Sequence, residues 1–163
     1  IIIDVMQAFH LSIPLRLISN GSYVHKQHVQ RGLKLMAEFH GEVWIKVDAV
    51  SEGSILRING VKLDAIRLRS QVEAVAALCP SWIQTFLMAW DDQPPSEVEI
   101  NSYIDFISGL KRDEVDVRGV LLYGLARHSQ QEEAVHLKPL DAGWMKLMAG
   151  RIESSGLKVR LSL

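Results

Sequence analysis

Lys46 and Asp48 are the residues whose types and spacing most clearly suit chemistry. They lie two positions apart in the apolar run EVWIKVDA (42–49), so in a β-strand both side chains point to the same face of the sheet. An ammonium and a carboxylate held together could bind a polar ligand, and a lysine in this place could also form a Schiff base, as in an aldolase. Two interpretations stay open: a binding site, or an ion pair that satisfies only itself.

Other polar or glycine-flanked residues lie within or at the ends of predicted strands. Asn20–Gly21 follows the first strand, Gln84 interrupts the third, and Tyr123–Leu125 ends the fourth. Ligands of parallel α/β folds bind at the carboxyl ends of strands, so these residues could surround a ligand together with Asp48. Simpler interpretations stay open as well: a turn after the first strand, water or a neighbouring strand as the partner of Gln84, and a plain strand end.

The pattern of apolar runs predicts the sheet that would bring these residues together. Five runs suit strands in length and composition, at 13–19, 42–49, 81–90, 117–125 and 157–163. Segments with helical periodicity lie between them, at 25–40, 64–78, 96–110 and 140–155. Successive strands start 29 to 40 residues apart, which is typical of βα units. We predict an α/β fold, a partial (β/α) TIM-like barrel with parallel strands and outer helices, as a single domain over residues 1–163.

Composition excludes several classes of protein. Hydrophobic residues make up 48% and charged residues 23%, as in a globular protein, and no apolar run approaches the roughly 20 residues of a membrane helix. The net charge of −1 gives no broad basic field for nucleic acid. The one cysteine, Cys79, cannot form an internal disulfide or a cysteine-rich metal site, so we predict no metal site and a cytoplasmic location.

Four short motifs occur in the same order as in a known family: Ser19-Asn20-Gly21, Lys46-Val47-Asp48 with Arg57-Ile58-Asn59-Gly60, Gln84-Thr85, and Tyr123-Gly124-Leu125-Ala126-Arg127. They resemble the "TNG" strand end, the "KLD"-like segment with its "INRP"-like turn, the "QT" strand and the "YxLxRP"-like strand end of the radical S-adenosylmethionine (radical SAM) superfamily. The resemblance covers nearly the whole chain. It is closest to glycyl-radical activating enzymes, such as pyruvate formate-lyase activating enzyme, and to wyosine-tRNA biosynthesis proteins.

The resemblance implies an oxidoreductase-like enzyme with two cofactors. In this superfamily a four-iron, four-sulfur (4Fe-4S) cluster, held by a CxxxCxxC loop, binds S-adenosylmethionine and reductively cleaves it to a 5′-deoxyadenosyl radical. The resemblance places Asn20, Lys46 and Asp48 at the methionine or ribose part of S-adenosylmethionine. It places Gln84, Tyr123 and Leu125 near the ribose and adenine. It assigns no catalytic residue.

The sequence departs from the family in its cluster ligands. The cysteine triad and the "GGE"-type segment are missing, Asn59-Gly60 stands for the family's "NRP", and Arg127-His128 stands for its "RP". The chain starts on an uncapped apolar helical pattern. We therefore expect the later βα units of a radical SAM domain without its N-terminal cluster-binding part. We expect this chain alone to bind neither cofactor and to be inactive. The alternative is a cluster-less barrel that binds a small ligand or a partner.

The substrate stays open among a protein glycyl-radical partner, a tRNA and a small metabolite. We expect no membrane partner. An exposed barrel edge would favour a homodimer, because unpaired strand edges readily pair with another chain.

Overall fold

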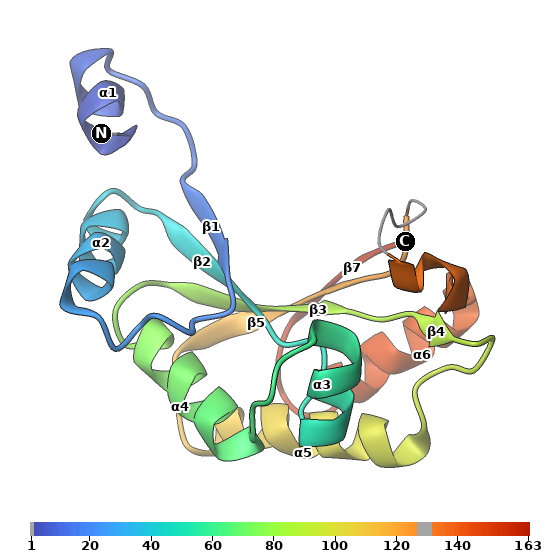
Figure 1. The fold of residues 1–163 in the computed structure, drawn as a ribbon. Helices are drawn as coiled ribbons and strands as arrows, with labels where there is room; N and C mark the ends of the chain where they lie inside the picture. Colours follow the sequence, from blue (N-terminus) through green and yellow to red (C-terminus); the bar gives the residue numbers. More distant parts are fainter. Residues whose placement is uncertain (1, 127–131) are drawn as a thin grey trace.

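The molecule is built on a parallel sheet of five strands (Figure 1). The computed structural model describes residues 2–126 and 132–163. The strands are β1 (Arg16–Ser19), β2 (Glu42–Lys46), β3 (Ser81–Phe86), β5 (Val117–Tyr123) and β7 (Val159–Ser162), hydrogen-bonded in that order. Within the described ranges β1 and β7 do not pair with each other, so the barrel is partial and open. The predicted class, α/β with parallel strands and outer helices, is confirmed.

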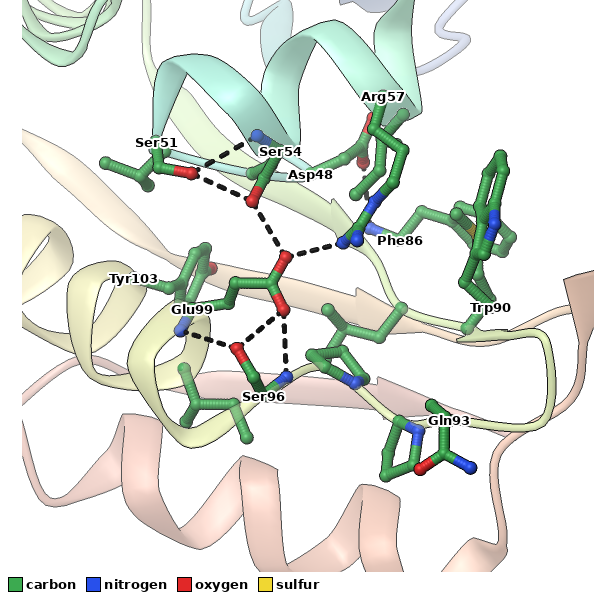
Figure 2. A pocket seen from close by; sticks show the side chains of 18 of the residues that line it. Asp48, Ser51, Ser54, Arg57, Phe86, Trp90, Gln93, Ser96, Glu99 and Tyr103 are labelled. Atoms are coloured by element: carbon green, nitrogen blue, oxygen red, sulfur yellow. Dashed lines mark hydrogen bonds and ion pairs between the residues drawn. The ribbon is translucent and has the colours of Figure 1, made fainter.

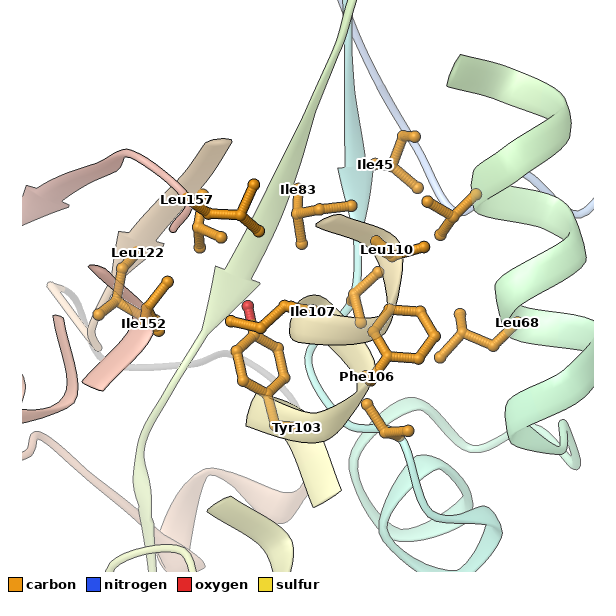
Figure 3. Packing of buried hydrophobic residues seen from close by; sticks show 14 of the residues in the cluster. Ile45, Leu68, Ile83, Tyr103, Phe106, Ile107, Leu110, Leu122, Ile152 and Leu157 are labelled. Atoms are coloured by element: carbon orange, nitrogen blue, oxygen red, sulfur yellow. The ribbon is translucent and has the colours of Figure 1, made fainter. Parts of the chain in front are cut away.

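One face of the sheet carries the core. Figure 1 shows α4 (Ala65–Ala76), α5 (Glu97–Arg112) and α6 (Ala142–Glu153) along that face, and α2 (Gln27–Glu38) adds the buried Leu33 to it. Alternate strand residues are fully buried against these helices because strand side chains alternate between faces. Figure 3 shows part of this packing; its labelled residues include Ile45, Ile83, Ile107, Leu110, Leu122 and Ile152.

The opposite face carries the charged residues of the strands, whereas the polar Ser81 and Thr85 are buried on the core side. In β2, Trp44 and Lys46 are half-buried, whereas Val43 and Ile45 are fully buried on the core side. No helix of the described ranges lies across this face in Figure 1. The predicted alternation of β2, and with it the shared face of Lys46 and Asp48, therefore matches the structure.

The helix starts follow ordinary capping chemistry. Ser96 and Glu99 form the predicted capping box at the start of α5: the Ser96 side chain accepts from the Glu99 N–H, and the Glu99 carboxylate accepts from the Ser96 N–H. Asp64 and Asp141 cap α4 and α6 in the same way, by accepting from backbone N–H groups of the first turn. Local sequence therefore determines where these three helices begin.

Two segments differ from the prediction. The expected strand 81–90 stops at Phe86, and β4 (Ala89–Trp90) instead pairs antiparallel with β6 (Leu137–Lys138), which follows the short 3₁₀ helix η1 (Glu132–His136). The expected turn at Arg57–Gly60 is the end of an unpredicted helix, α3 (Glu52–Asn59). Ser51 caps its start, and Gly60, at a φ of 68°, ends it.

Near the N-terminus, α1 (Ile2–Ala8) stands away from the sheet (Figure 1).

Gly119 allows β5 to lie close to β7. The pairing of β3 with β5 shifts register between Ser81 and Ile83, and Gly119, in the corresponding part of β5, has a φ of 147°. A Cβ there would lie 2.4 Å from the carbonyl oxygen of Lys158 and 2.9 Å from the Trp82 ring. Only glycine fits this position without moving a neighbouring strand.

Among the described residues, no helix combines the length and hydrophobicity that a bilayer requires.

Candidate functional site

The carboxyl edge of the sheet holds two clefts that meet at Lys46 and Asp48. The first, called here the β1 cleft, has a volume of about 640 Å³ and is lined by Asn20, Lys46 and Asp48, among others. The second, the β5 cleft, has a volume of about 690 Å³ and adds Tyr123 and Trp90 to the same two residues. Volumes of this size suit small-molecule ligands, which typically occupy about 300–1,000 Å³.

Lys46 and Asp48 form an ion pair, with Nζ 3.3 Å from Oδ2. The Asp48 side chain is only 2% exposed, whereas that of Lys46 is 37% exposed. The Asp48 carboxylate also accepts from Asn59 Nδ2 at 3.1 Å and from the Phe86 N–H at 2.9 Å. A buried carboxylate requires such partners, because water no longer solvates it. The charge of Asp48 is therefore satisfied from β2, α3 and β3 together.

The electrostatics of the pair keep Lys46 charged. Burial works to lower the pKa of Lys46, but the Asp48 carboxylate and Tyr123 outweigh burial and raise this pKa above its ordinary value. Burial raises the pKa of Tyr123, although Lys46 works to lower it. A Schiff base needs a neutral amine, so the raised pKa of Lys46 argues against the aldolase interpretation. The site suits recognition of a polar ligand better than nucleophilic attack by Lys46.

Only some of the other residues predicted to contact a ligand line the two clefts. Asn20 accepts from the Ser22 N–H at 3.1 Å, which confirms the turn, and it also lines the β1 cleft. Gln84 lies beside Lys46 in the sheet, and its side-chain oxygen is buried with no hydrogen-bond partner among the described residues. Neither Gln84 nor Leu125 lines either cleft. Arg127 and His128 fall outside the described residues. The cofactor roles of all these residues stay predictions.

Glu99 links two helices, whereas the sequence pattern predicts only that it helps to cap α5. Its Oε1 accepts from Ser54 Oγ at 2.7 Å and from the Arg57 guanidinium, so it joins the start of α5 to α3 (Figure 2). Its Oε2 accepts from the Ser96 N–H and hydroxyl. Ser54 and Arg57 lie more than 40 residues from Glu99 in the chain, and no local pattern signals their contact. Asn59, the partner of Asp48, comes from this same helix α3.

The Glu99 network predicts a loss of stability in acid. Burial works to raise the pKa of Glu99, but hydrogen bonds from Ser96 and Ser54 and the charge of Arg57 lower it from 4.5 to about 2. A carboxylate whose pKa is lower in the folded state than in the unfolded state stabilises the fold at pH values above its unfolded-state pKa. For Glu99 this stabilisation is lost as the pH falls from 4.5 to about 2. Glu99→Gln should lower the unfolding free energy by about 1 kcal/mol near neutral pH, because the carboxylate is partly screened by water.

Urea unfolding across the acid range tests this prediction. The stability difference between the wild type and Glu99→Gln should shrink towards pH 2. Glu97→Gln is the matched control: the Glu97 side chain is 72% exposed and pairs with Arg151, so its replacement should have a smaller effect. If the stability difference between the wild type and Glu99→Gln did not shrink in acid, the lowered pKa of Glu99 would be contradicted.

The single cysteine lies at the wrong edge of the sheet for a cluster beside Lys46. Cys79 is buried just before β3 begins, at the amino edge, with its Sγ 3.6 Å from the Gly41 carbonyl oxygen. Burial raises the pKa of its thiol, which disfavours the thiolate that binds iron. Nor do the described residues contain a group of three or more His, Cys, Asp or Glu side chains placed to hold a metal ion. The residues of this chain do not fit a 4Fe-4S cluster, which takes several cysteine ligands.

Comparisons with known proteins support the fold. No family model and no curated protein matches the sequence. Among solved structures, the chain is similar to a domain of pyruvate-formate lyase-activating enzyme from Bacteroides vulgatus ATCC 8482, with a TM-score of 0.67 and 13% identity over 99% of this chain and 89% of that one. It is also similar to CbXyn10B, with a TM-score of 0.51 and 10% identity over 98% of this chain but only 53% of that one. A GH10 protein from Paenibacillus barcinonensis has a TM-score of 0.50 and 9% identity over 82% and 39%.

Proposed function

We propose that this chain is the later part of a radical SAM domain and that, against the expectation drawn from its missing cluster ligands, the carboxyl edge of its sheet binds S-adenosylmethionine without the cluster. The observation that carries the proposal is the Lys46–Asp48 pair at the junction of the two clefts. The order of the four motifs supports it. So does the fold shared with a domain of an enzyme of the kind that these motifs resemble.

The residues of the two clefts fit the chemical groups of S-adenosylmethionine. The ammonium groups of Lys46 and Lys62 in the β1 cleft suit the carboxylate of the methionine part. The Asn59 side chain lines both clefts and suits hydroxyl groups such as those of ribose, and the buried Asp48 positions both Asn59 and Lys46. In the β5 cleft, Tyr123 offers an aromatic face for a base, and its ring lies 5.3 Å from that of Phe86.

Bound S-adenosylmethionine supplies this superfamily with hydrogen-abstraction chemistry. The chain itself lacks the cysteines for the cluster that starts this chemistry. Its proposed task is therefore to hold and orient the cofactor through the polar groups of the carboxyl edge, not to cleave it.

Replacement of Lys46 tests the proposal. Titration calorimetry of the wild type with S-adenosylmethionine should show saturable binding at one site. Lys46→Met should weaken this binding by about tenfold, or about 1.4 kcal/mol. The ligand loses a cationic partner, and the Asp48 carboxylate loses the ammonium group with which it forms an ion pair.

Lys158→Met is the matched control, because Lys158 is exposed and precedes β7 at the opposite edge of the sheet. It should bind as the wild type does. Equal affinities of the Lys46 and Lys158 variants, or no saturable binding by the wild type, would refute the proposal.

A further inference from the structure

A separate pocket lies beside the carboxyl edge, between α3, the segment after β3 and the start of α5 (Figure 2). We call it the α3–α5 pocket. Its volume is about 370 Å³, at the lower end of the range for small-molecule sites, about 300–1,000 Å³. Asp48, Arg57, Phe86 and Trp90 line both this pocket and the β5 cleft, so the two hollows share a wall.

The charged side chains in the pocket wall, and most of its hydroxyl groups, already have partners. Glu99 holds Ser54, Ser96 and Arg57, and the Arg57 guanidinium also lies 5.9 Å from the centre of the Trp90 ring. The hydroxyl of Tyr103 lies 2.7 Å from Thr85 Oγ1. A charged ligand would find no unpaired countercharge among these groups and would lose its hydration on entry.

Much of the remaining wall is apolar, although Ser51, Asp91 and Gln93 also line the pocket. The apolar part includes the buried side chains Val50, Leu87, Met88, Ile100 and Met148, together with Ile58 and two prolines at the rim, Pro94 and Pro95. Methionine side chains are flexible and polarisable, so Met88 and Met148 can adapt to ligands of different shape. Pockets with this combination of apolar walls and satisfied polar groups bind ligands mainly through burial of apolar surface.

We propose that the α3–α5 pocket is a second ligand site, which takes an uncharged, apolar group, aliphatic or aromatic, of a small molecule. Because the pocket shares a wall with the β5 cleft, such a group would lie next to any ligand at the carboxyl edge. The proposal does not depend on S-adenosylmethionine binding, and its test uses no S-adenosylmethionine.

Methionine methyl NMR with two matched probes tests the proposal. The chain has five methionines, so a ¹³C-methyl-methionine sample gives five signals. Met148 reports from the pocket alone, and Met88 reports from the wall that the pocket shares with the β5 cleft. Toluene should shift these two signals saturably, below its solubility limit, and leave Met6 and Met36 unchanged. Benzoate, which carries a carboxylate on the same ring, should bind at least about tenfold more weakly.

A variant that fills the pocket provides a second arm. Val50→Phe places a larger side chain in the pocket wall and should abolish the toluene shifts. Val98→Phe makes the same change at a position that is 76% exposed on α5, and it should leave them intact. The proposal is overturned if toluene gives no saturable shift at Met88 and Met148, if all five signals shift alike, or if benzoate binds equally well. If Val50→Phe does not fold, the comparison of the two probes on the wild type still decides.

Discussion

Replacing Asp48 by alanine should abolish S-adenosylmethionine binding and cost about 3 kcal/mol of unfolding free energy. The Asp48 side chain is 2% exposed and engages Lys46, Asn59 and the Phe86 N–H at once. Removal of the Asp48 side chain leaves the half-buried Lys46 ammonium group without a carboxylate partner. It also leaves the Phe86 N–H and the Asn59 amide without an acceptor. Buried donors that lose their acceptor cost about 1–3 kcal/mol each when water cannot replace it.

Two variants separate charge from packing at this position. Asp48→Asn keeps the shape and one acceptor oxygen, so it should lose less stability than alanine yet still lose most of the binding. Asp64→Ala removes an aspartate that only caps α4, and it should cost about 1 kcal/mol with unchanged binding. Urea unfolding and titration calorimetry on the same samples give both quantities. Wild-type affinity in Asp48→Ala would remove Asp48 from the site.

Gly119→Ala should be the most destabilising small change in the sheet, at about 3 kcal/mol. The added methyl would lie 2.4 Å from the Lys158 carbonyl oxygen, in a backbone that already has a φ of 147°. Strand β5 would have to move away from β7 or change its bulge. Because β5 ends at Tyr123, we also expect weaker ligand binding at the β5 cleft.

Gly150→Ala is the matched control for this prediction. Gly150 lies inside α6, and a Cβ there meets no other atom within 4 Å. Alanine has the higher helix propensity, so this variant should gain about 0.5–1 kcal/mol. Chemical unfolding of both variants measures the contrast. If Gly119→Ala were as stable as the wild type, the close approach of β5 and β7 would be wrong.

Local patterns in the sequence predict most of the sheet. Alternation in 42–49 places Lys46 and Asp48 on one face, and the βα spacing implies a parallel sheet that gathers its strand ends at one edge. These are short-range properties, so the sequence shows them directly. The Ser96–Glu99 capping box, predicted from the same kind of local signal, is present.

Tertiary contacts account for what the sequence did not reveal. Helix α3 is short, and in the sequence its Ser51 cap and Gly60 stop do not stand out from the signals of an ordinary turn. The partner of Asp48 is Asn59 at the end of that helix, and Glu99 reaches α3 from α5. The strand 81–90 was predicted too long because its apolar run continues past Phe86, where the chain leaves the sheet to form β4.

The central claim, that the carboxyl edge binds S-adenosylmethionine, is tested most directly by mapping amide signals of the ¹⁵N-labelled chain during titration with this ligand. We predict saturable shifts at Asn20, Asp48 and Tyr123, while Glu42 and Arg118 at the amino edge stay unchanged. Absent shifts at the carboxyl edge, or shifts confined to Glu42 and Arg118, would contradict the claim.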